Sequence, residues 1–224
     1  MPTSSVTWRE AVGLGRPLTA TLRAAALGLG LGIALVAVLL GALALAGAFQ
    51  IHGRQRIPEG FEAVYTSWHL RRLLLEGLQS LGETAIICFL FLGVLRRYLP
   101  LMGAVVGAAL IFGALHLDRP HITVPVVVSV AIVVGLPVLA LFVRLRSFWA
   151  AAGFHFAWNI LLGTVFGVVV AGQDRFGVLD SVVGGPALWT GGAYGVEGSL
   201  SACLINGLAC LLILRRELLR PPYP

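Results

Sequence analysis

The chain is organised around the stretch Gly82-Glu83-Thr84-Ala85-Ile86-Ile87-Cys88, in which one carboxylate stands in an otherwise apolar helical segment. A bare carboxylate near the middle of a bilayer costs roughly 2.5 to 3.5 kcal/mol on insertion scales. Glu83 is therefore expected to have a function or a polar partner. Three later polar residues in apolar surroundings, His116, His155 and Asn159, are the candidates for that partner set.

The composition points to a membrane protein. Of the 224 residues, 58% are hydrophobic and only 12% are charged, which is too apolar for a soluble domain. The predicted fold class is all-α, a polytopic membrane bundle of about six transmembrane helices, with the lipid bilayer as its first partner. A net charge of +6 would suggest nucleic acid in a soluble chain, but the arginines here stand beside apolar runs, where they orient spans. No nucleic-acid partner is expected.

The hydropathy pattern divides the chain into a polar N-terminal segment (residues 1–17), an integral membrane domain (18–216) and a C-terminal tail (217–224). The first apolar run is far longer than the roughly 7 to 15 residues of a signal-peptide core, so it is expected to be a retained span. Six spans are predicted, at about 18–49, 73–95, 101–117, 123–143, 148–171 and 198–214.

The segments between the spans carry weaker signals. Residues 61–72 hold several aromatic side chains among polar ones, which is typical of an interfacial helix. The glycine-rich segment 172–197 is too polar to cross a membrane, so it is expected to be a connection. In the fourth span, Pro125 and Pro137 are expected to bend the helix.

Every basic residue of the chain is an arginine, and the arginines fall unequally on the two sides of the predicted spans. With a cytoplasmic N-terminus, the larger group lies inside: Arg9, Arg16, Arg23, Arg96, Arg97, Arg144, Arg146, Arg215, Arg216 and Arg220. The smaller group lies outside: Arg54, Arg56, Arg71, Arg72, Arg119 and Arg175. By the positive-inside rule both termini are expected to be cytoplasmic. The expected location is a bacterial inner membrane.

Four residues carry the candidate chemistry. His116 follows Phe112 by four positions and Asn159 follows His155 by four, so each pair shares a helical face. With Glu83, three helices would then supply a carboxylate, two imidazoles and an amide. Such a set suits a hydrolytic centre, in which the carboxylate and one imidazole activate a water while the other imidazole and the amide stabilise an oxyanion.

The order Glu83, then Phe112-x-x-x-His116, then His155-x-x-x-Asn159, on successive helices, resembles the CPBP (CAAX-processing and bacteriocin-processing, or Abi) family of intramembrane proteases. That family includes the type II CAAX prenyl endopeptidases. The resemblance implies that Glu83 and His116 activate the attacking water. It implies that His155 and Asn159 stabilise the oxyanion during peptide-bond cleavage.

The resemblance covers about residues 73–214, most of the chain. The stretch Trp189-Thr190-Gly191-Gly192-Ala193-Tyr194-Gly195-Val196-Glu197-Gly198-Ser199 is also similar to the segment that precedes the last helix in many bacterial members. The implied activity is that of an endopeptidase acting on membrane-associated or lipidated, CAAX-like substrates. The resemblance does not fix an oligomeric state.

The first motif departs from the family pattern Glu-Glu-x-x-x-Arg. After Glu83 the chain has Thr84 and Cys88 in place of the second Glu and the Arg, which would stand four apart and form an ion pair. Losing both leaves no orphan charge, so the helix can tolerate the change. In an alternative register Gly82 and Glu83 occupy the two Glu positions, which would remove the base and predict an inactive protein. The first register keeps the spacing to Leu95-Arg96-Arg97 and is preferred.

Each candidate residue also has a simpler interpretation. Glu83 can hydrogen-bond a neighbouring helix, His116 can be an interfacial histidine, and His155 and Asn159 can hold helices together. The main alternative function is therefore a catalytically silent binding or scaffold protein of the same fold. A small transporter is less well supported, since no repeat symmetry is present.

Further polar residues have structural interpretations. Glu76 and Gln79 are expected on the rim of a hydrated cavity, and Glu197 at the N-terminus of the last helix as a cap. The three cysteines, Cys88, Cys203 and Cys210, are expected to be buried thiols, because their spacing suggests neither a zinc site nor a disulfide framework. Two His and one Glu can hold zinc, but there is no His-Glu-x-x-His motif, so no metal and no cofactor are predicted.

Overall fold

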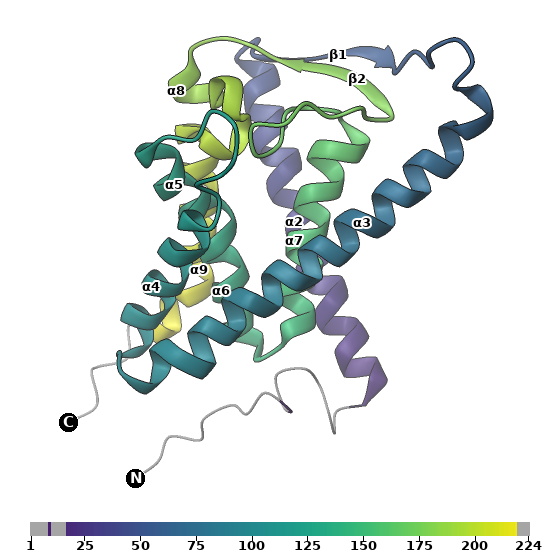
Figure 1. The fold of residues 1–224 in the computed structure, drawn as a ribbon. Helices are drawn as coiled ribbons and strands as arrows, with labels where there is room; N and C mark the ends of the chain where they lie inside the picture. The colour runs from purple at the N-terminus through teal and green to yellow at the C-terminus, as the bar shows by residue number, and fades with distance from the viewer. Residues whose placement is uncertain (1–8, 10–16, 219–224) are drawn as a thin grey trace.

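The computed structural model of the chain describes residue 9 and residues 17–218. Nearly all of the predicted N-terminal segment and most of the predicted C-terminal tail therefore lie outside the described residues. Within them the chain forms a helical bundle with one small sheet at one end (Figure 1). The predicted all-α membrane bundle is confirmed, with that sheet as an addition.

The bundle is built from one long N-terminal helix, one long diagonal helix and a set of shorter ones (Figure 1). The α-helices are α2 (Leu18–Leu45), α3 (Glu62–Phe89), α4 (Leu101–Ala114), α5 (Val124–Val130), α6 (Leu136–Leu145), α7 (Phe148–Asn159), α8 (Ala187–Thr190) and α9 (Leu200–Leu218). Wider π-helical turns occupy Leu90–Val94, Ala131–Gly135 and Ile160–Val165. Short 3-10 turns occupy Leu95–Arg97, Gly192–Tyr194 and Val196–Gly198.

Four helical stretches in the described residues are long and apolar enough to cross a membrane: Leu18–Leu45, Glu62–Arg97, Val124–Leu145 and Phe148–Val165. Helices also occur at the other two predicted span positions. At 14 residues, α4 is about 21 Å long, shorter than a hydrocarbon core of about 30 Å. It ends at Ala114 rather than at the predicted Leu117, which leaves His116 in the following turn.

The predicted separate interfacial helix at 61–72 is absent, because α3 runs without a break from Glu62 to Phe89. No glycine or proline interrupts the chain between Glu62 and Glu76, so nothing stops the helix at the polar-to-apolar boundary. The result is one helix of 28 residues that crosses the face of the bundle diagonally (Figure 1). This single rigid element carries both Glu76 and Glu83.

A two-stranded antiparallel sheet joins the connection after α2 to the predicted connection 172–197. Strand β1 (Phe49–Arg54) pairs with β2 (Leu179–Val183), with Phe49 opposite Val183 and an irregularity between Ile51 and Gly53. Neither strand can be predicted from local periodicity, because each is short and its partner lies far away in sequence. The sheet closes the end of the bundle where α2 ends (Figure 1).

Small residues allow α2 and α7 to pack closely. A Cβ atom added at Gly28 would collide with the carbonyl oxygen of Ala150, and one at Gly153 would lie 2.5 Å from the carbonyl oxygen of Ala25. Gly32, one turn after Gly28, would place a Cβ atom 2.7 Å from that of Ala157. Helices in membranes commonly associate through such small residues, since close backbone approach increases van der Waals contact. This contact fixes α7, which carries two of the candidate residues.

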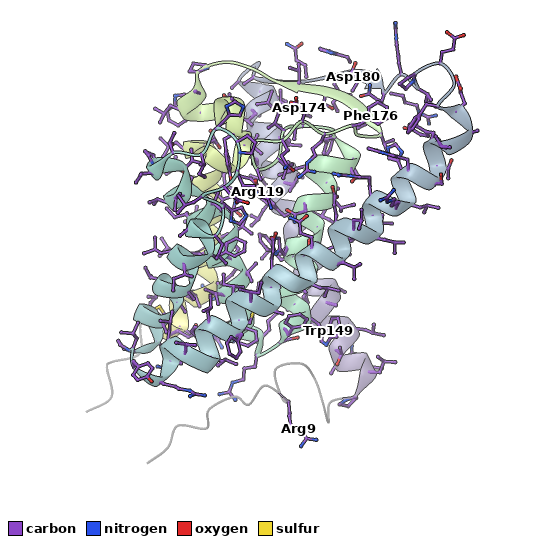
Figure 2. The ribbon with its side chains drawn as sticks, viewed as in Figure 1. Arg9, Arg119, Trp149, Asp174, Phe176 and Asp180 are labelled. Carbon is purple, nitrogen blue, oxygen red and sulfur yellow. The ribbon has the colours of Figure 1, made fainter. Side chains whose placement is uncertain are left out.

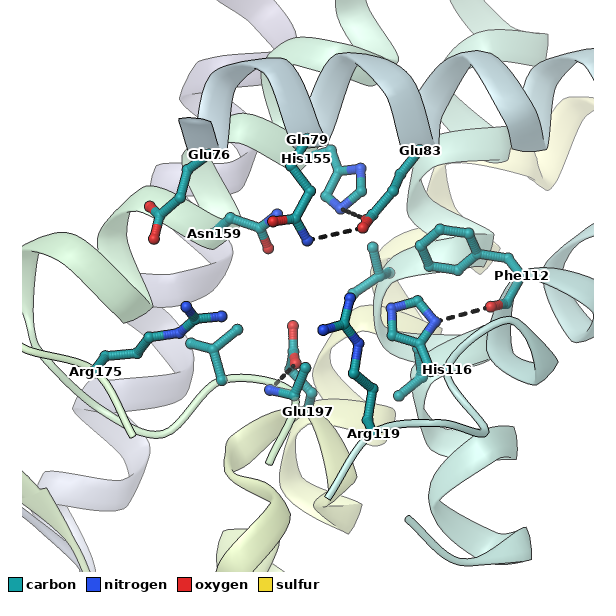
Figure 3. A pocket seen from close by; sticks show the side chains of 14 residues that line it. Glu76, Gln79, Glu83, Phe112, His116, Arg119, His155, Asn159, Arg175 and Glu197 are labelled. Carbon is teal, nitrogen blue, oxygen red and sulfur yellow. Dashed lines mark hydrogen bonds and ion pairs between the residues drawn. The ribbon is translucent and has the colours of Figure 1, made fainter. Parts of the chain in front are cut away.

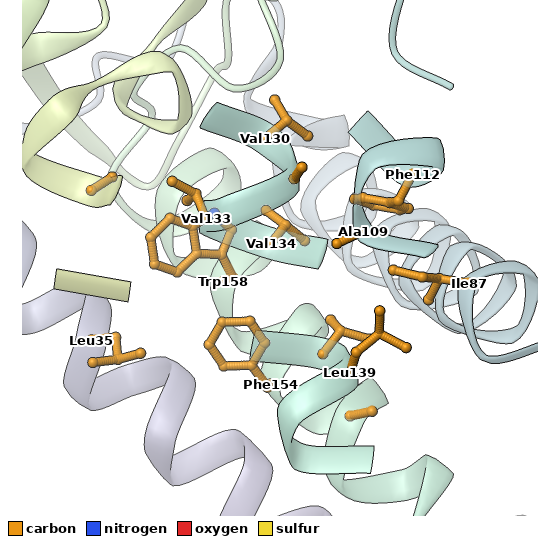
Figure 4. Close-up of a cluster of buried hydrophobic side chains, with 14 of the residues drawn as sticks. Leu35, Ile87, Ala109, Phe112, Val130, Val133, Val134, Leu139, Phe154 and Trp158 are labelled. Carbon is orange, nitrogen blue, oxygen red and sulfur yellow. The ribbon is translucent and has the colours of Figure 1, made fainter. Parts of the chain in front are cut away.

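The core beside the candidate residues is aromatic and aliphatic (Figure 4). Trp158, Phe154 and Leu139 are all essentially inaccessible to solvent. In the fourth predicted span, Pro125 lies in the first turn of α5, and the π-helical turn Ala131–Gly135 ends two residues before Pro137. The proline lacks the N–H that would bond to the carbonyl of Val133, so the regular ladder is interrupted there.

Candidate active site

The four predicted site residues line a single cavity (Figure 3). Glu83 comes from α3, His116 from the turn after α4, and His155 and Asn159 from α7. About 30 Å³ of the cavity is open to the centres of water molecules. A single water requires roughly 10–15 Å³ by the same measure, so the cavity can hold water.

Two polar groups hold the Glu83 carboxylate in place. Gln79, one turn earlier on α3, donates from Nε2 to Oε1 of Glu83 at 2.8 Å. On the other side, Nε2 of His155 lies 3.4 Å from Oε2 of Glu83 (Figure 3). The carboxylate is only partly buried, with its side chain 21% exposed. Its position therefore does not depend on the Glu and Arg that the family motif would supply.

His155 is held at both ring nitrogens. Its Nδ1 atom lies 3.2 Å from the hydroxyl oxygen of Thr84, and the residue is 2% exposed. Because the carboxylate of Glu83 can only accept, a neutral ring fits best with the proton on Nε2 and with Nδ1 accepting from the Thr84 hydroxyl. Thr84, which stands where the family has its second Glu, thus fixes the orientation of this ring.

His116 presents a free ring nitrogen to the cavity. Its Nδ1–H donates to the carbonyl oxygen of Phe112 at 3.0 Å, which places the proton on Nδ1. The neutral ring then has its lone pair on Nε2. Phe112 separates the two histidines, since its ring centroid lies 4.9 Å from that of His116 and 5.9 Å from that of His155. His116 therefore offers a proton acceptor, whereas His155 offers a donor.

Asn159 lies at the last position of α7, directly before the π-helical turn Ile160–Val165. Its Nδ2 atom donates to the hydroxyl oxygen of Ser80 on α3 at 3.1 Å. An amide NH2 group has two hydrogens, so one remains for a ligand in the cavity. Single π-helical turns are frequent at functional sites.

Glu76 and Gln79 line the cavity, as predicted. Glu76 is buried and accepts from Arg72 at 2.7 Å and from the Thr164 hydroxyl at 2.8 Å. The ion pair with Arg72 lies within α3, whereas the hydrogen bond from Thr164 comes from the π-helical turn after α7. Glu76 therefore links α3 to that turn. This set of contacts is structural and does not place Glu76 next to the histidines.

The prediction for Glu197 was wrong. The residue that caps α9 is Ser199, whose hydroxyl oxygen accepts from the backbone N–H of Ala202 at 3.0 Å. Glu197 instead enters the cavity wall, 4% exposed, and accepts from Trp158 Nε1 and from the backbone N–H of Ala171, each at 3.0 Å. The sequence places it only three residues before the helix, where a cap is the simplest assignment.

Burial raises the pKa of Glu197, because a charged carboxylate is poorly solvated in this wall. The charge of His116 and the hydrogen bonds from Trp158 and Ala171 act in the opposite direction. Glu197 is thus a second acidic group close to the candidate centre.

The surroundings of Gly82, Thr84 and Cys88 distinguish the two possible registers of the first motif. A Cβ atom added at Gly82 would meet nothing within 4 Å, so this position faces away from the cavity that Glu83 lines. Thr84 and Cys88, in contrast, are both fully buried. This arrangement supports the register in which Glu83 is the first Glu of the motif.

Two cavity residues, Arg119 and Arg175, were not predicted. Both come from connections, Arg119 from the turn after α4 and Arg175 from the segment after α7 (Figure 3). No helical period or motif marks them, so only the fold brings them to the site. Among the residues that the structure describes, no group of three or more His, Cys, Asp or Glu side chains is arranged to hold a metal ion.

Residues 62–161 match the model of the family described as Rce1-like, type II CAAX prenyl endopeptidase Rce1-like. This segment is somewhat less than half of the chain and contains all four candidate residues. The match confirms the resemblance to the CPBP, or CAAX protease, family, whose fold is a polytopic helical membrane bundle. It supports a function of the same general kind, that of a CAAX-type intramembrane protease. No curated protein and no solved structure matches the chain significantly.

Proposed function

We propose that the chain is an intramembrane endopeptidase that hydrolyses peptide bonds of membrane-associated or lipidated, CAAX-like substrates. One observation carries the proposal: Glu83, His116, His155 and Asn159 line one small polar cavity that can hold water. Two acceptors, the Glu83 carboxylate and the free nitrogen of His116, and two donors, His155 and Asn159, bound the same space. This division is what hydrolysis of an amide requires.

In the proposed reaction, a water donates its hydrogen bonds to Glu83 and to Nε2 of His116. Glu83 takes one proton as the water oxygen attacks the carbonyl carbon of the scissile peptide bond. The bond between carbon and nitrogen then breaks, and the proton moves from Glu83 to the leaving amine. The products are a new carboxyl terminus and a free amine, with one water consumed.

The negative oxygen of the tetrahedral intermediate is assigned to His155 and Asn159. Asn159 has one N–H that Ser80 does not use. His155 directs its Nε2 toward Glu83 in the resting protein. Once Glu83 has accepted a proton and lost its charge, this N–H is free to donate to the oxyanion. Removing one donor of this kind typically lowers kcat by about 100- to 1000-fold.

The experiment is cleavage of a panel of membrane peptides, some of them prenylated, by the purified protein in detergent. Glu83→Ala and His155→Ala are expected to abolish cleavage. His121→Ala is the matched control, because His121 lies in the turn after His116 and is not among the cavity residues. Equal cleavage by all variants would contradict the proposed site.

The second candidate function is a catalytically silent protein of the same fold, and the observation in its favour is Thr84 and Cys88 at the positions of the motif's second Glu and Arg. Activity that is absent in the wild type but present in the double variant Thr84→Glu, Cys88→Arg would favour it. Activity in the wild type would exclude it.

We propose a bacterial inner membrane as the location, with both termini cytoplasmic. The end of the bundle that holds the start of α2 and the end of α6 also holds Arg144, Arg146 and Arg215. The opposite end, with the sheet and the 172–197 connection, mixes arginines with acidic residues such as Asp174 and Asp180 (Figure 2). The excess of positive charge at the first end supports this orientation. A cysteine-accessibility assay at each end tests it.

A further inference from the structure

Residues of α2, α6 and α9 line a groove in the half of the bundle opposite the sheet (Figure 1). It shares no residue with the candidate active-site cavity. Its volume is about 540 Å³, which falls within the range of roughly 300–1,000 Å³ for pockets that hold small molecules. The groove is therefore large enough to bind a ligand of its own.

Most of the groove wall is aliphatic. Leu27 and Leu31 lie one turn apart on α2, Leu141 comes from α6, and Leu212 comes from α9. The side chains of Leu27 and Leu212 are 61% and 59% exposed, so the protein itself does not cover this surface. Because α2 and α6 belong to stretches that are long and apolar enough to cross a membrane, the surface meets the hydrocarbon of the bilayer.

Three arginines border the groove, Arg144 from the last turn of α6 and Arg215 and Arg216 from the last turns of α9. Arg144 follows Leu141 by three positions, and the other two follow Leu212 by three and four. Side chains at these spacings share a helical face. The guanidinium groups therefore stand one turn nearer the end of the bundle than the leucines, above one end of an apolar hollow.

The positive charge of these arginines is not neutralised within the part of the chain that the structure describes. None of the three forms an ion pair there, and none of the described residues that line the groove is acidic. Three cations around one hollow create a positive potential that attracts anions. The planar fork of a guanidinium group also matches a phosphate in a bidentate arrangement.

We propose that this groove binds one anionic phospholipid of the adjoining leaflet. The phosphate lies between Arg144 on α6 and the two arginines on α9, and an acyl chain runs along Leu212 and Leu27. Basic pockets between membrane helices are typical sites for anionic head groups. A free phosphate would leave the apolar wall uncovered, and a zwitterionic lipid would bring a second cation next to the arginines.

The test titrates delipidated protein in detergent with phosphatidylglycerol and phosphatidylcholine of the same acyl chains, and counts bound lipids by native mass spectrometry. We expect wild-type protein to bind the first phosphatidylglycerol at least about fivefold more tightly than phosphatidylcholine. The double variant Arg144→Gln, Arg215→Gln should bind both lipids equally. The matched control is Arg96→Gln, Arg97→Gln, which removes two charges at the same end of the bundle but outside the groove, and it should keep the preference (Figure 1).

A second pair of variants tests the apolar wall. Leu212→Trp fills the groove without changing its charge and should weaken binding of phosphatidylglycerol several-fold, because the acyl chain loses its place. Leu211→Trp is the matched control, since Leu211 is equally exposed on α9, at 59%, but lies outside the groove. Glycerol phosphate carries the phosphate without acyl chains and should not displace the lipid at equal concentration.

Four results would overturn the lipid site. They are no preference of the wild type for phosphatidylglycerol, an equal loss of preference in the Arg96→Gln, Arg97→Gln control, unchanged affinity in Leu212→Trp, and displacement of the lipid by glycerol phosphate. The last of these would assign the arginines to a free phosphate instead. None of these measurements involves cleavage, so their outcome is independent of the proposed hydrolysis.

Discussion

The Nε2 atom of His155 lies 3.4 Å from the Oε2 atom of Glu83, and this contact joins α7 to α3 in the middle of the bundle. Two residues that were predicted to belong to one site, Glu83 on α3 and His155 on α7, thus lie in contact. Thr84 completes the arrangement by bonding the far side of the ring, which makes it a positioning residue.

Replacing Thr84 with valine tests this role. The shape is nearly conserved, but the hydroxyl that bonds Nδ1 of His155 is lost. A hydrogen bond of this kind contributes about 0.5–1.5 kcal/mol, so we expect kcat to fall by roughly 2- to 13-fold. Thr84→Ser keeps the hydroxyl and should retain most of the activity. A valine variant with unchanged kcat would show that the contact does not position the ring.

The missing ion pair of the motif can be restored in a double-mutant cycle. Cys88 is fully buried, so Cys88→Arg alone leaves a buried charge unpaired and should destabilise the protein by about 3–5 kcal/mol. Adding Thr84→Glu, one helical turn earlier, should recover part of that loss. Thermal unfolding in detergent measures the coupling. Additive losses would mean that no pair forms.

Because α2 and α7 pack closely, we expect alanine substitutions at two glycines of α2, Gly28 and Gly30, to differ markedly in their effect on stability. Gly28→Ala would drive a methyl group into the backbone of Ala150, and overpacking of this kind costs about 1–3 kcal/mol. Gly30→Ala, on the same helix, meets nothing within 4 Å and should be neutral. The unfolding midpoints of the two variants check this. Equal midpoints would contradict the packing described here.

The raised pKa of Glu197 leads us to expect that the stability of the protein depends on pH. Its pKa is raised in the folded protein, so the folded state binds more protons than the unfolded one at pH values between the unfolded pKa, about 4.3, and the folded pKa. Stability conferred by the protonated carboxyl is therefore complete below the unfolded pKa and lost as the pH rises through the folded pKa.

Glu197→Gln removes the titrating group while keeping an oxygen that can accept from Trp158. The unfolding midpoint of the variant should fall less than that of the wild type as the pH is raised from about 4 to 7. Parallel pH profiles for the two proteins would show that the carboxyl of Glu197 does not titrate differently in the folded state.

The helices and the candidate site residues were predictable from sequence for a definite reason. Glu83, His116, His155 and Asn159 are polar residues in apolar surroundings, and the spacing of four between His155 and Asn159 places these two on one face of α7. Such residues are conspicuous in a membrane segment, because every polar group there must find a partner.

What the sequence did not predict depends on contacts between distant segments. Strands β1 and β2 are defined only by each other. Arg119 and Arg175 lie in connections whose path no periodic pattern describes, and Glu197 was assigned to the helix it precedes rather than to the wall that it enters. Sequence analysis assigns a residue to its nearest helix or loop, whereas in the folded protein these residues contact segments that are distant in sequence.

The most direct test of the central claim is cleavage of the membrane-peptide panel in water enriched in 18O, with the products analysed by mass spectrometry. If Glu83 activates the water, wild-type protein releases a fragment with one 18O atom in its new carboxyl group, and Glu83→Gln reduces this product by at least about 100-fold while leaving the fold intact. Undiminished labelled product from the Glu83→Gln protein, or no cleavage of any peptide by the wild type, would contradict a hydrolytic centre built on Glu83.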